Sequence, residues 1–240
     1  MQSKFELEVI RVDDDWGRAQ ALSVMRATYR DDKGWLAREE SLVARDELRS
    51  GNVSWFVARL DQQPVSVLRV LYSPPLDLKA GGGFRPLSDL DLETFSREHR
   101  IAEIGRFAAV PPQRRNFLVA AALMRAACTE TIRRGCSHYI TDVSAGEKDR
   151  PHSFHTRVMG FEAVATQDAG ELNCPNRRVT LLLSLRDAYH RLRTKGGWLF
   201  NYLTESWDAE LHAVMSRTAK VLDVSQTNSG YDSFGNRGVN

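Results

Sequence analysis

A carboxylate and a guanidinium occur three residues apart in a segment that is otherwise apolar. In IAEIGRFAAV (101–110), Glu103 and Arg106 interrupt a pattern that is typical of a buried strand. A partly buried carboxylate can take a proton from an amine, directly or through a water, and arginine presents a planar fork that binds carboxylates. The same two residues could instead form a salt bridge that caps an edge strand. The spacing alone leaves a catalytic pair and a structural pair both open.

On an ideal strand, residues three apart point to opposite faces of the sheet. A β-bulge within the strand predicted over 101–109 would turn Glu103 and Arg106 toward one pocket, and such bulges are common beside active sites. The bulge would also free backbone donors that can polarise a reacting carbonyl group. We therefore expect a bulge in this strand.

The residues that follow this strand are suited to bind an anion. A Pro-Pro turn leads into a helix predicted over 117–134, whose first N–H groups and positive dipole end favour a phosphate. After Gly135 the segment SHYITDV (137–143) predicts another strand, which completes a βαβ unit. Ligands of such sheets lie beyond the carboxyl ends of the parallel strands, which here means residues 109–116.

The remaining chain alternates strand and helix patterns and therefore predicts an α/β fold with a mixed central sheet flanked by helices. Alternating or apolar runs predict strands at 5–12, 54–60 and 64–72, and two more after residue 160. Helical patterns at 13–29 and after residue 184 add an N-terminal helix and extra C-terminal helices. We expect a domain at 1–184, a helical extension at 185–222 packed on it, and a flexible tail at 223–240.

Composition excludes several other classes of protein. The 240 residues carry 33 Lys+Arg against 31 Asp+Glu, so no global positive charge indicates nucleic acid as a partner. Neither a transmembrane run nor a signal-peptide core is visible, and we expect a cytoplasmic protein. The three cysteines lack metal-ligand spacing, and His152 and His155 have no obvious third ligand, so no metal site is predicted.

The segment VPPQRRNFLVAAALM (110–124), together with MGF (159–161), resembles the Gly-rich motif and the terminal GF element of the GCN5-related N-acetyltransferase (GNAT) superfamily. The resemblance implies a GNAT-like sheet and a donor whose pantetheine arm is held after the strand. Leu118 stands where the superfamily normally has a glycine, and Thr156 stands where it often has a tyrosine acid. The donor-binding residues implied are Val110, Pro112, Gln113, Arg114, Arg115, Asn116, Phe117 and Leu118.

Two more motifs, MRATYRDDKGW (25–35) and AEIGRFAA (102–109), with Arg69 between them, resemble the N-acyl amino acid synthases and the related acyl-homoserine lactone synthases. The resemblance covers about residues 5 to 184 and implies a catalytic Glu103 with Arg106. The implied acceptor-binding residues are Arg26, Tyr29, Trp35 and Arg69.

We therefore expect an N-acyltransferase that moves a fatty acyl chain from acyl carrier protein, or acyl-CoA, to the amine of an amino acid or a related small molecule. The acyl donor is a co-substrate, and no permanently bound cofactor is expected. Arg125, Arg133 and Arg134 form a basic face that is either simply solvated or receives the acidic carrier protein. Two alternatives stay open: a lactone synthase that uses S-adenosylmethionine, and an acyl-binding module without turnover.

Overall fold

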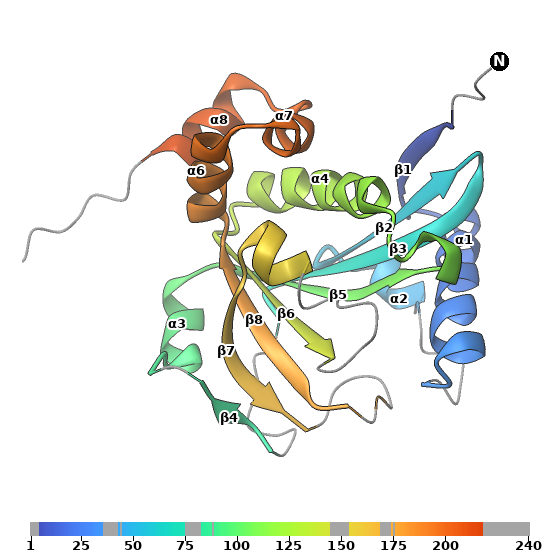
Figure 1. Cartoon of the computed structure of the whole chain (residues 1–240), viewed down its shortest axis with the longest axis horizontal. Coiled ribbons are helices and arrows are strands. Elements are labelled where there is room, and N and C mark those ends of the chain that lie inside the picture. Colours follow the sequence, from blue (N-terminus) through green and yellow to red (C-terminus); the bar gives the residue numbers. More distant parts are fainter. Residues whose placement is uncertain are drawn as a thin grey trace, which may run out of the picture.

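One mixed β-sheet organises the chain. The computed structural model describes residues 5–35, 43, 45–74, 83–87, 89–144, 154–168, 174 and 176–217. In this part of the chain, eight strands are hydrogen-bonded in the order β1-β2-β3-β5-β6-β8-β7-β4 (Figure 1). The strands are β1 (Leu7–Arg11), β2 (Val53–Leu60), β3 (Gln63–Tyr72), β4 (Arg85–Pro86), β5 (Ile101–Ala109), β6 (His138–Ser144), β7 (Glu162–Gln167) and β8 (Arg178–Ser184).

The predicted βαβ unit is present as β5, the helix α4 (Phe117–Arg133) and β6. β5 and β6 run parallel, whereas the other neighbouring strands described are antiparallel. A parallel pair needs a long crossover, and α4 supplies it. Asn116 caps the start of the helix, since its side chain accepts the N–H of Val119. The helix ends before Gly135, which has a φ of +74°.

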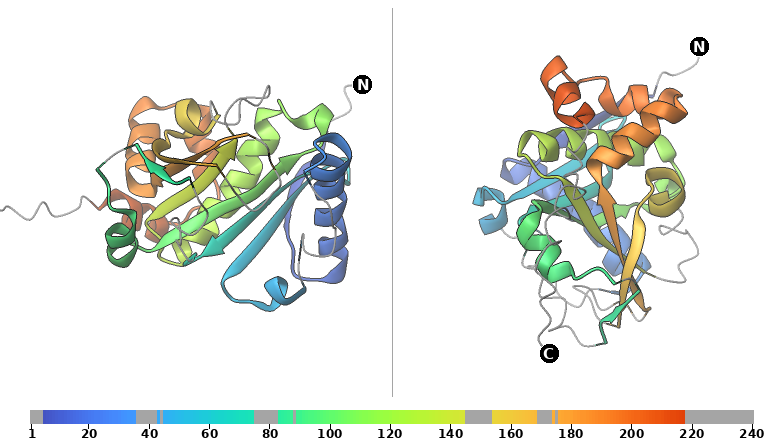
Figure 2. Two further views of the ribbon diagram at one scale, coloured as in Figure 1. Left: turned by 90° about the horizontal axis from the view of Figure 1, so that it is seen from below. Right: turned by 90° about the vertical axis from the view of Figure 1, so that its left-hand side faces the viewer.

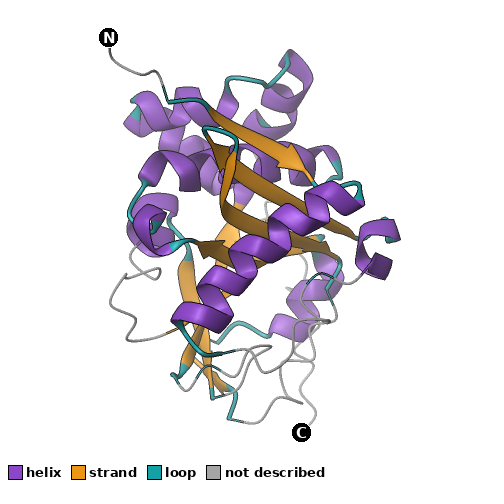
Figure 3. Ribbon diagram, turned by 90° about the vertical axis from the view of Figure 1, so that its right-hand side faces the viewer, coloured by secondary structure: helices purple, strands orange, loops and turns teal. Residues whose placement is uncertain are grey.

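Helices cover both faces of the sheet. α4 buries Leu123, Met124, Ala127 and Cys128 against one face, as its sequence pattern predicts. On the other face lies α1 (Asp15–Met25), which crosses in front of the strands in Figure 3 and packs on residues of β2 and β3. α1 continues directly into a π-helix, η1 (Arg26–Asp32), which brings the MRATYRDDKGW motif to the end of β5. The hydrophobic cluster between α1 and the sheet also includes Val43 and Leu48, at α2 (Arg45–Arg49).

The predicted C-terminal helices are α6 (Leu185–Lys195), α7 (Trp198–Thr204) and α8 (Ala209–Ser216). Figure 2 shows them gathered on the same side of the sheet as α4. Their buried side chains join the hydrophobic cluster beneath α4, and Trp207 Nε1 donates to Thr129 Oγ1 of α4 at 3.0 Å. The tail at 223–240 lies outside the described residues, and the domain boundary at residue 184 stays a prediction. No described helix combines the length and apolar character that crossing a membrane requires.

The remaining short elements are α3 (Leu92–Glu98), the 3-10 turn η2 (Pro111–Gln113) and the π-helix η3 (Phe154–Met159). The predicted hairpin is also present, with β2 and β3 joined by Asp61 and Gln62. Both residues adopt left-handed backbone conformations, with φ of 49° and 65°, which suits a tight two-residue turn between twisted strands.

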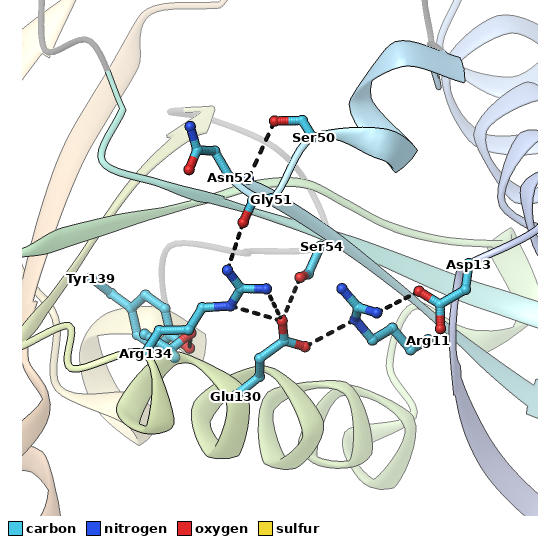
Figure 4. Close-up of polar contacts among 10 residues, drawn as sticks. Arg11, Asp13, Ser50, Gly51, Asn52, Ser54, Glu130, Arg134 and Tyr139 are labelled. Atoms are coloured by element: carbon cyan, nitrogen blue, oxygen red, sulfur yellow. Dashed lines mark hydrogen bonds and ion pairs between the residues drawn. The ribbon is translucent and has the colours of Figure 1, made fainter.

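A polar network fixes α4 to the sheet (Figure 4). Glu130 of α4 accepts hydrogen bonds from Ser54 of β2 at 2.7 Å and from Arg134, and it forms an ion pair with Arg11 of β1 at 3.2 Å. Burial raises the pKa of Glu130, but the hydrogen bonds from Ser54 and Arg134 outweigh this effect and hold the pKa below its ordinary value. The ionised carboxylate therefore stabilises the position of α4.

The arginines of the predicted basic face are engaged within the protein. Arg125 forms an ion pair with Glu205 and lies over the ring of Tyr202. Arg133 lies 3.8 Å from Asp208. Arg134 also donates to the carbonyl of Gly51 at 2.6 Å. Their charges are thus largely offset by carboxylates of the same chain, which weakens the expectation that this face receives an acidic carrier protein.

Replacing Glu130 with Gln should lower the free energy of unfolding by about 1–3 kcal/mol at pH 7, because Arg134 and Arg11 would keep their positive charges without the carboxylate. A carboxyl with a lowered folded pKa stabilises the protein above its unfolded pKa of about 4.5, and this contribution is lost as the pH falls. The difference between wild type and variant should therefore narrow below pH 4.5 in urea titrations. The same change at the exposed Glu98 is the control and should have little effect; equal effects at both positions would contradict the role of Glu130.

Candidate active site

A cavity opens where β5 and β6 separate. Their parallel pairing begins at Ile101 and His138 and ends at Ile104 and Thr141, although both strands continue beyond this point. The hydroxyl of Thr141 donates to the carbonyl of Ile104 at 2.8 Å at the last pair. The cavity has a volume of about 350 Å³ and is lined by β5, the end of β6, η1 and the start of α4. Beyond the fork, backbone groups of β5 can bind a ligand in place of a neighbouring strand.

The predicted bulge lies in β5. Val67 and Arg69 of β3 face Ala108 and Gly105, so β5 carries one extra residue between these pairs. Arg106 lies in this interval and has a φ of 52°, a left-handed conformation that is strained for a residue other than glycine. Glu103 and Arg106 both line the cavity, as do the residues of β5 between them. The bulge predicted in this strand is therefore confirmed.

Glu103 forms an ion pair that is largely withdrawn from solvent. Its Oε1 accepts a hydrogen bond from Arg69 Nη2 at 3.1 Å, and the Arg69 side chain is only 6% exposed. Arg69 Nη1 also lies 3.8 Å from Glu47 of α2. Glu103 itself is 30% exposed and faces the cavity, whereas Arg69 is not among the cavity residues. Arg69 therefore supports Glu103 from outside the cavity lining.

Gly105 gives the ion pair its space. A Cβ at this position would lie 3.0 Å from Arg69 Nη2 and 3.1 Å from Glu103 Oε1, which is tighter than most Cβ contacts and would require the ion pair to shift by a few tenths of an ångström. Gly105 is the partner of Arg69 in the β3–β5 register, so the arginine crosses directly over it to reach Glu103. The sequence Glu-Ile-Gly-Arg thus combines the carboxylate, the space for its partner and the bulge residue.

The N-terminal motif forms one wall of the cavity. Tyr29 donates from its hydroxyl to the carbonyl of Phe107 at 3.2 Å, and Thr28 donates to the carbonyl of Ala109 at 3.1 Å. Trp35 stacks on Tyr29 with ring centroids 5.9 Å apart. Tyr29 and Trp35 both line the cavity, but Arg26 is exposed and is not among its residues. Of the predicted acceptor residues, the structure thus brings the two aromatic ones to the cavity.

The start of α4 forms a second wall. Arg114, Arg115, Asn116 and Phe117 line the cavity, and Arg114 also pairs with Asp32 of η1. The predicted donor residues Val110, Pro112, Gln113 and Leu118 are not among the cavity residues. Leu118 is 52% exposed on the outside of α4.

Sequence reasoning missed the wall on the β6 side. Asp142 and Ser144 follow the fork on β6, and Arg178 begins β8 opposite them. The rule that ligands lie at the carboxyl ends of parallel strands could have indicated the two β6 residues. The sequence offers His152 and His155 as a pair of candidate metal ligands. His152 lies outside the described residues, whereas His155 is described. It is instead buried in the cavity wall, where its ring contacts Phe107 and Phe161.

Solved structures of the GNAT fold are similar to this chain. The chain is similar to an acetyltransferase assigned to the GNAT family from Desulfovibrio desulfuricans, with a TM-score of 0.51, 13% identity and coverage of 75% of this chain and 99% of that one. It is also similar to the ribosomal-protein-S18-alanine N-acetyltransferase from Escherichia coli, with a TM-score of 0.50, 11% identity and coverage of 75% and 94%. The predicted GNAT-like fold is thereby confirmed.

The structure of FeeM, an N-acyl amino acid synthase from uncultured soil microbes, is similar with a TM-score of 0.60, 14% identity and coverage of 79% of this chain and 96% of that chain. A sequence profile of the N-acyl amino acid synthase FeeM family matches residues 20–181. This chain belongs to the N-acyl amino acid synthase FeeM family and is an N-acyltransferase. No curated protein sequence matches the chain. Among the three functions that the sequence left open, the family selects acylation of amino acids over the lactone synthase and the non-catalytic module.

Replacing Gly105 with Ala should lower turnover roughly 10 to 100-fold, because the added methyl group pushes Arg69 and Glu103 out of position. Folding should be affected less than activity, since the backbone at Gly105 is not left-handed and the strand can hold alanine. Turnover rates beside thermal melts measure the two effects. Gly51→Ala is the matched control, because a Cβ there meets nothing within 4 Å. A fully active Gly105→Ala protein would contradict the need for this geometry.

Proposed function

We propose that the enzyme transfers a fatty acyl chain from acyl carrier protein, or from acyl-CoA, to the α-amine of an amino acid. The position of Glu103 is the observation that supports the roles proposed for the cavity residues. Its carboxylate faces the cavity where β5 leaves β6, and Arg69 supports it at 3.1 Å. The N-terminus of α4 forms another wall of the same cavity. An amine and a thioester can therefore meet beside this carboxylate.

The start of α4 suits the phosphate of the donor arm. α4 has 17 residues, so its N-terminus presents unpaired N–H groups and the positive end of a full dipole. Arg114, Arg115 and Asn116 add side-chain donors in the cavity wall. An arm that runs from this end along β5 carries amides that can bond the backbone beyond Ile104, where β6 no longer pairs. With the arm in this course, the thioester at its end would lie toward the bulge of β5.

Glu103 is assigned as the base that prepares the amine. An amino acid carries its amine as ammonium at neutral pH, and the ionised carboxylate accepts one proton from it, directly or through a water. The neutral nitrogen then attacks the thioester carbonyl, so that the C–N bond forms and the C–S bond breaks. The nitrogen loses a second proton, and the sulfur leaves with one proton as a thiol. Arg69 stabilises the ionised carboxylate that begins this sequence, and Arg106 orders the site beside it.

Carrier protein is the donor that the surface favours. Phe117, which lines the cavity, contacts Trp198 with ring centroids 5.2 Å apart, and Leu118 and Trp198 are each 52% exposed. We call these three residues the apolar rim. Exposed apolar residues at a cavity edge that also contains Arg114 and Arg115 suit an acidic protein that delivers a tethered thioester. Free CoA needs the cavity but not the rim.

Replacing Leu118 with Asp should therefore reduce kcat/KM roughly tenfold or more with acyl carrier protein and leave acyl-CoA turnover nearly unchanged. The carrier-protein advantage of the wild type should also shrink as salt rises. Steady-state rates with both donors at several salt concentrations test this expectation. Val214→Asp places the same charge on α8 at another exposed apolar residue and serves as the control. Equal efficiency of both donors in the wild type at low salt would refute the preference.

Replacing Glu103 with Gln keeps the shape of the side chain but removes proton acceptance, so turnover should fall by roughly 100 to 10,000-fold. Higher pH should partly rescue this variant, because more of the amine is then already neutral. Single-turnover rates across pH, beside circular dichroism melts, provide the measurement. Glu47→Gln is the matched control, since it removes the other carboxylate near Arg69 but not the cavity carboxylate. If Glu103→Gln is stable with near-normal turnover at neutral pH, this carboxylate is not the base.

A further inference from the structure

Arg178 brings a positive charge into the cavity from a strand that the proposed chemistry does not use. It begins β8, where it faces Ser144 of β6 on one side and Gln167 of β7 on the other. It lines the same cavity as Glu103. β8 lies next to β6 in the sheet, so this charge enters on the far side of the fork from β5.

The neighbours of Arg178 hold it in place without neutralising it. Its Nη2 donates to the main-chain carbonyl of Asp142 at 3.3 Å. The carboxylate of Asp142 is held by Thr180, which donates to it at 2.7 Å, and by Gln167. Within the described residues no carboxylate forms an ion pair with Arg178, and its Nε is buried without a hydrogen-bond partner. A partly buried guanidinium in this state favours an anionic ligand.

The other cations at the cavity have different surroundings. Arg106 lies in the bulge of β5, and the proposed mechanism assigns it to ordering the site beside Glu103. Arg114 is paired with Asp32, and the Lys33 ammonium lies over the ring of Trp35 at 4.2 Å. Arg115 belongs to the start of α4, which is assigned to the donor phosphate. Of the arginines that the motif comparison implied for the acceptor, Arg26 and Arg69 are not among the cavity residues. Arg178 is thus well placed for a second anionic group.

We propose that Arg178 binds the α-carboxylate of the acceptor amino acid and thereby sets the preference for amino acids over plain amines. The inference rests on the proposed function, in which an amino acid amine meets Glu103. An amino acid carries its carboxylate one carbon from its amine, and a guanidinium can bind both oxygens of a carboxylate in one plane. A carboxylate anchored on the β8 side directs the amine toward the centre of the cavity, where β5 supplies Glu103.

The test compares an amino acid with the amine that remains after its carboxylate is removed. The probes are the amino acid of the standard set that the wild type acylates fastest and its decarboxylated counterpart. In Arg178→Met, KM for the amino acid should rise roughly 10 to 100-fold, as expected for the loss of charge-assisted hydrogen bonds, while KM for the decarboxylated amine stays unchanged. Arg178→Lys keeps the positive charge but loses the planar guanidinium. Its KM for the amino acid should lie between the values of the wild type and Arg178→Met.

Arg177→Met is the matched control, because the neighbouring Arg177 is 51% exposed and pairs with Asp168 at 3.3 Å. A wild type that uses both substrates equally well, or an Arg178→Met protein that loses both equally, would overturn the inference. Calorimetry with the amino acid alone gives a readout that is independent of turnover, and thermal melts report whether the variants fold. Absence of amino acid acylation in the wild type would refute the proposed function, whereas loss of discrimination alone refutes only the role of Arg178.

Discussion

The ion pair between Arg69 and Glu103 is the interaction on which the site depends. Arg69 is buried in β3 and can reach Glu103 because Gly105 has no side chain between them. The extra residue of β5 then lets the chain present Arg106 to the same cavity. One carboxylate, one glycine and one left-handed residue within four positions thus place the chemistry. In an ordinary strand, each of these three features would lower the stability of the protein. Here the carboxylate is paired with Arg69, the glycine leaves space for that pair, and the left-handed residue lies in the bulge.

This ion pair makes a structural role of Glu103 compatible with the proposed catalytic one. A buried guanidinium needs a compensating carboxylate, and leaving it without one is strongly unfavourable. Glu103 and Glu47 both supply negative charge to Arg69, but only Glu103 faces the cavity. In the proposed mechanism, the carboxylate that compensates Arg69 also accepts a proton when an amine is present. Glu47 keeps Arg69 partly compensated during that step.

The position of α4 matters as much as the bulge. A helix N-terminus beside the fork favours an anionic group such as the phosphate of the proposed donor. The network around Glu130 fixes the C-terminal half of α4 to β1 and β2, and Trp207 fixes it to the C-terminal helices. The C-terminal helices thereby support the helix whose other end lines the cavity. Trp198 of α7 also contacts Phe117 at that end.

Much of this protein is determined by local sequence. The period-two strands, the capped helix between β5 and β6, the hairpin and the need for a bulge at Glu-Ile-Gly-Arg all follow from neighbouring residues, whose pattern sets backbone conformation. The aromatic wall of Tyr29 and Trp35 followed from motif resemblance. Three features did not follow from local sequence: the exposed position of Leu118, the burial of His155 and the approach of Arg178 to the cavity. Each of them depends on which distant elements pack together. Arg178 reaches the cavity only because β8 inserts beside β6, a pairing between Ser144 and Arg178 that no local pattern specifies and that tertiary structure alone decides.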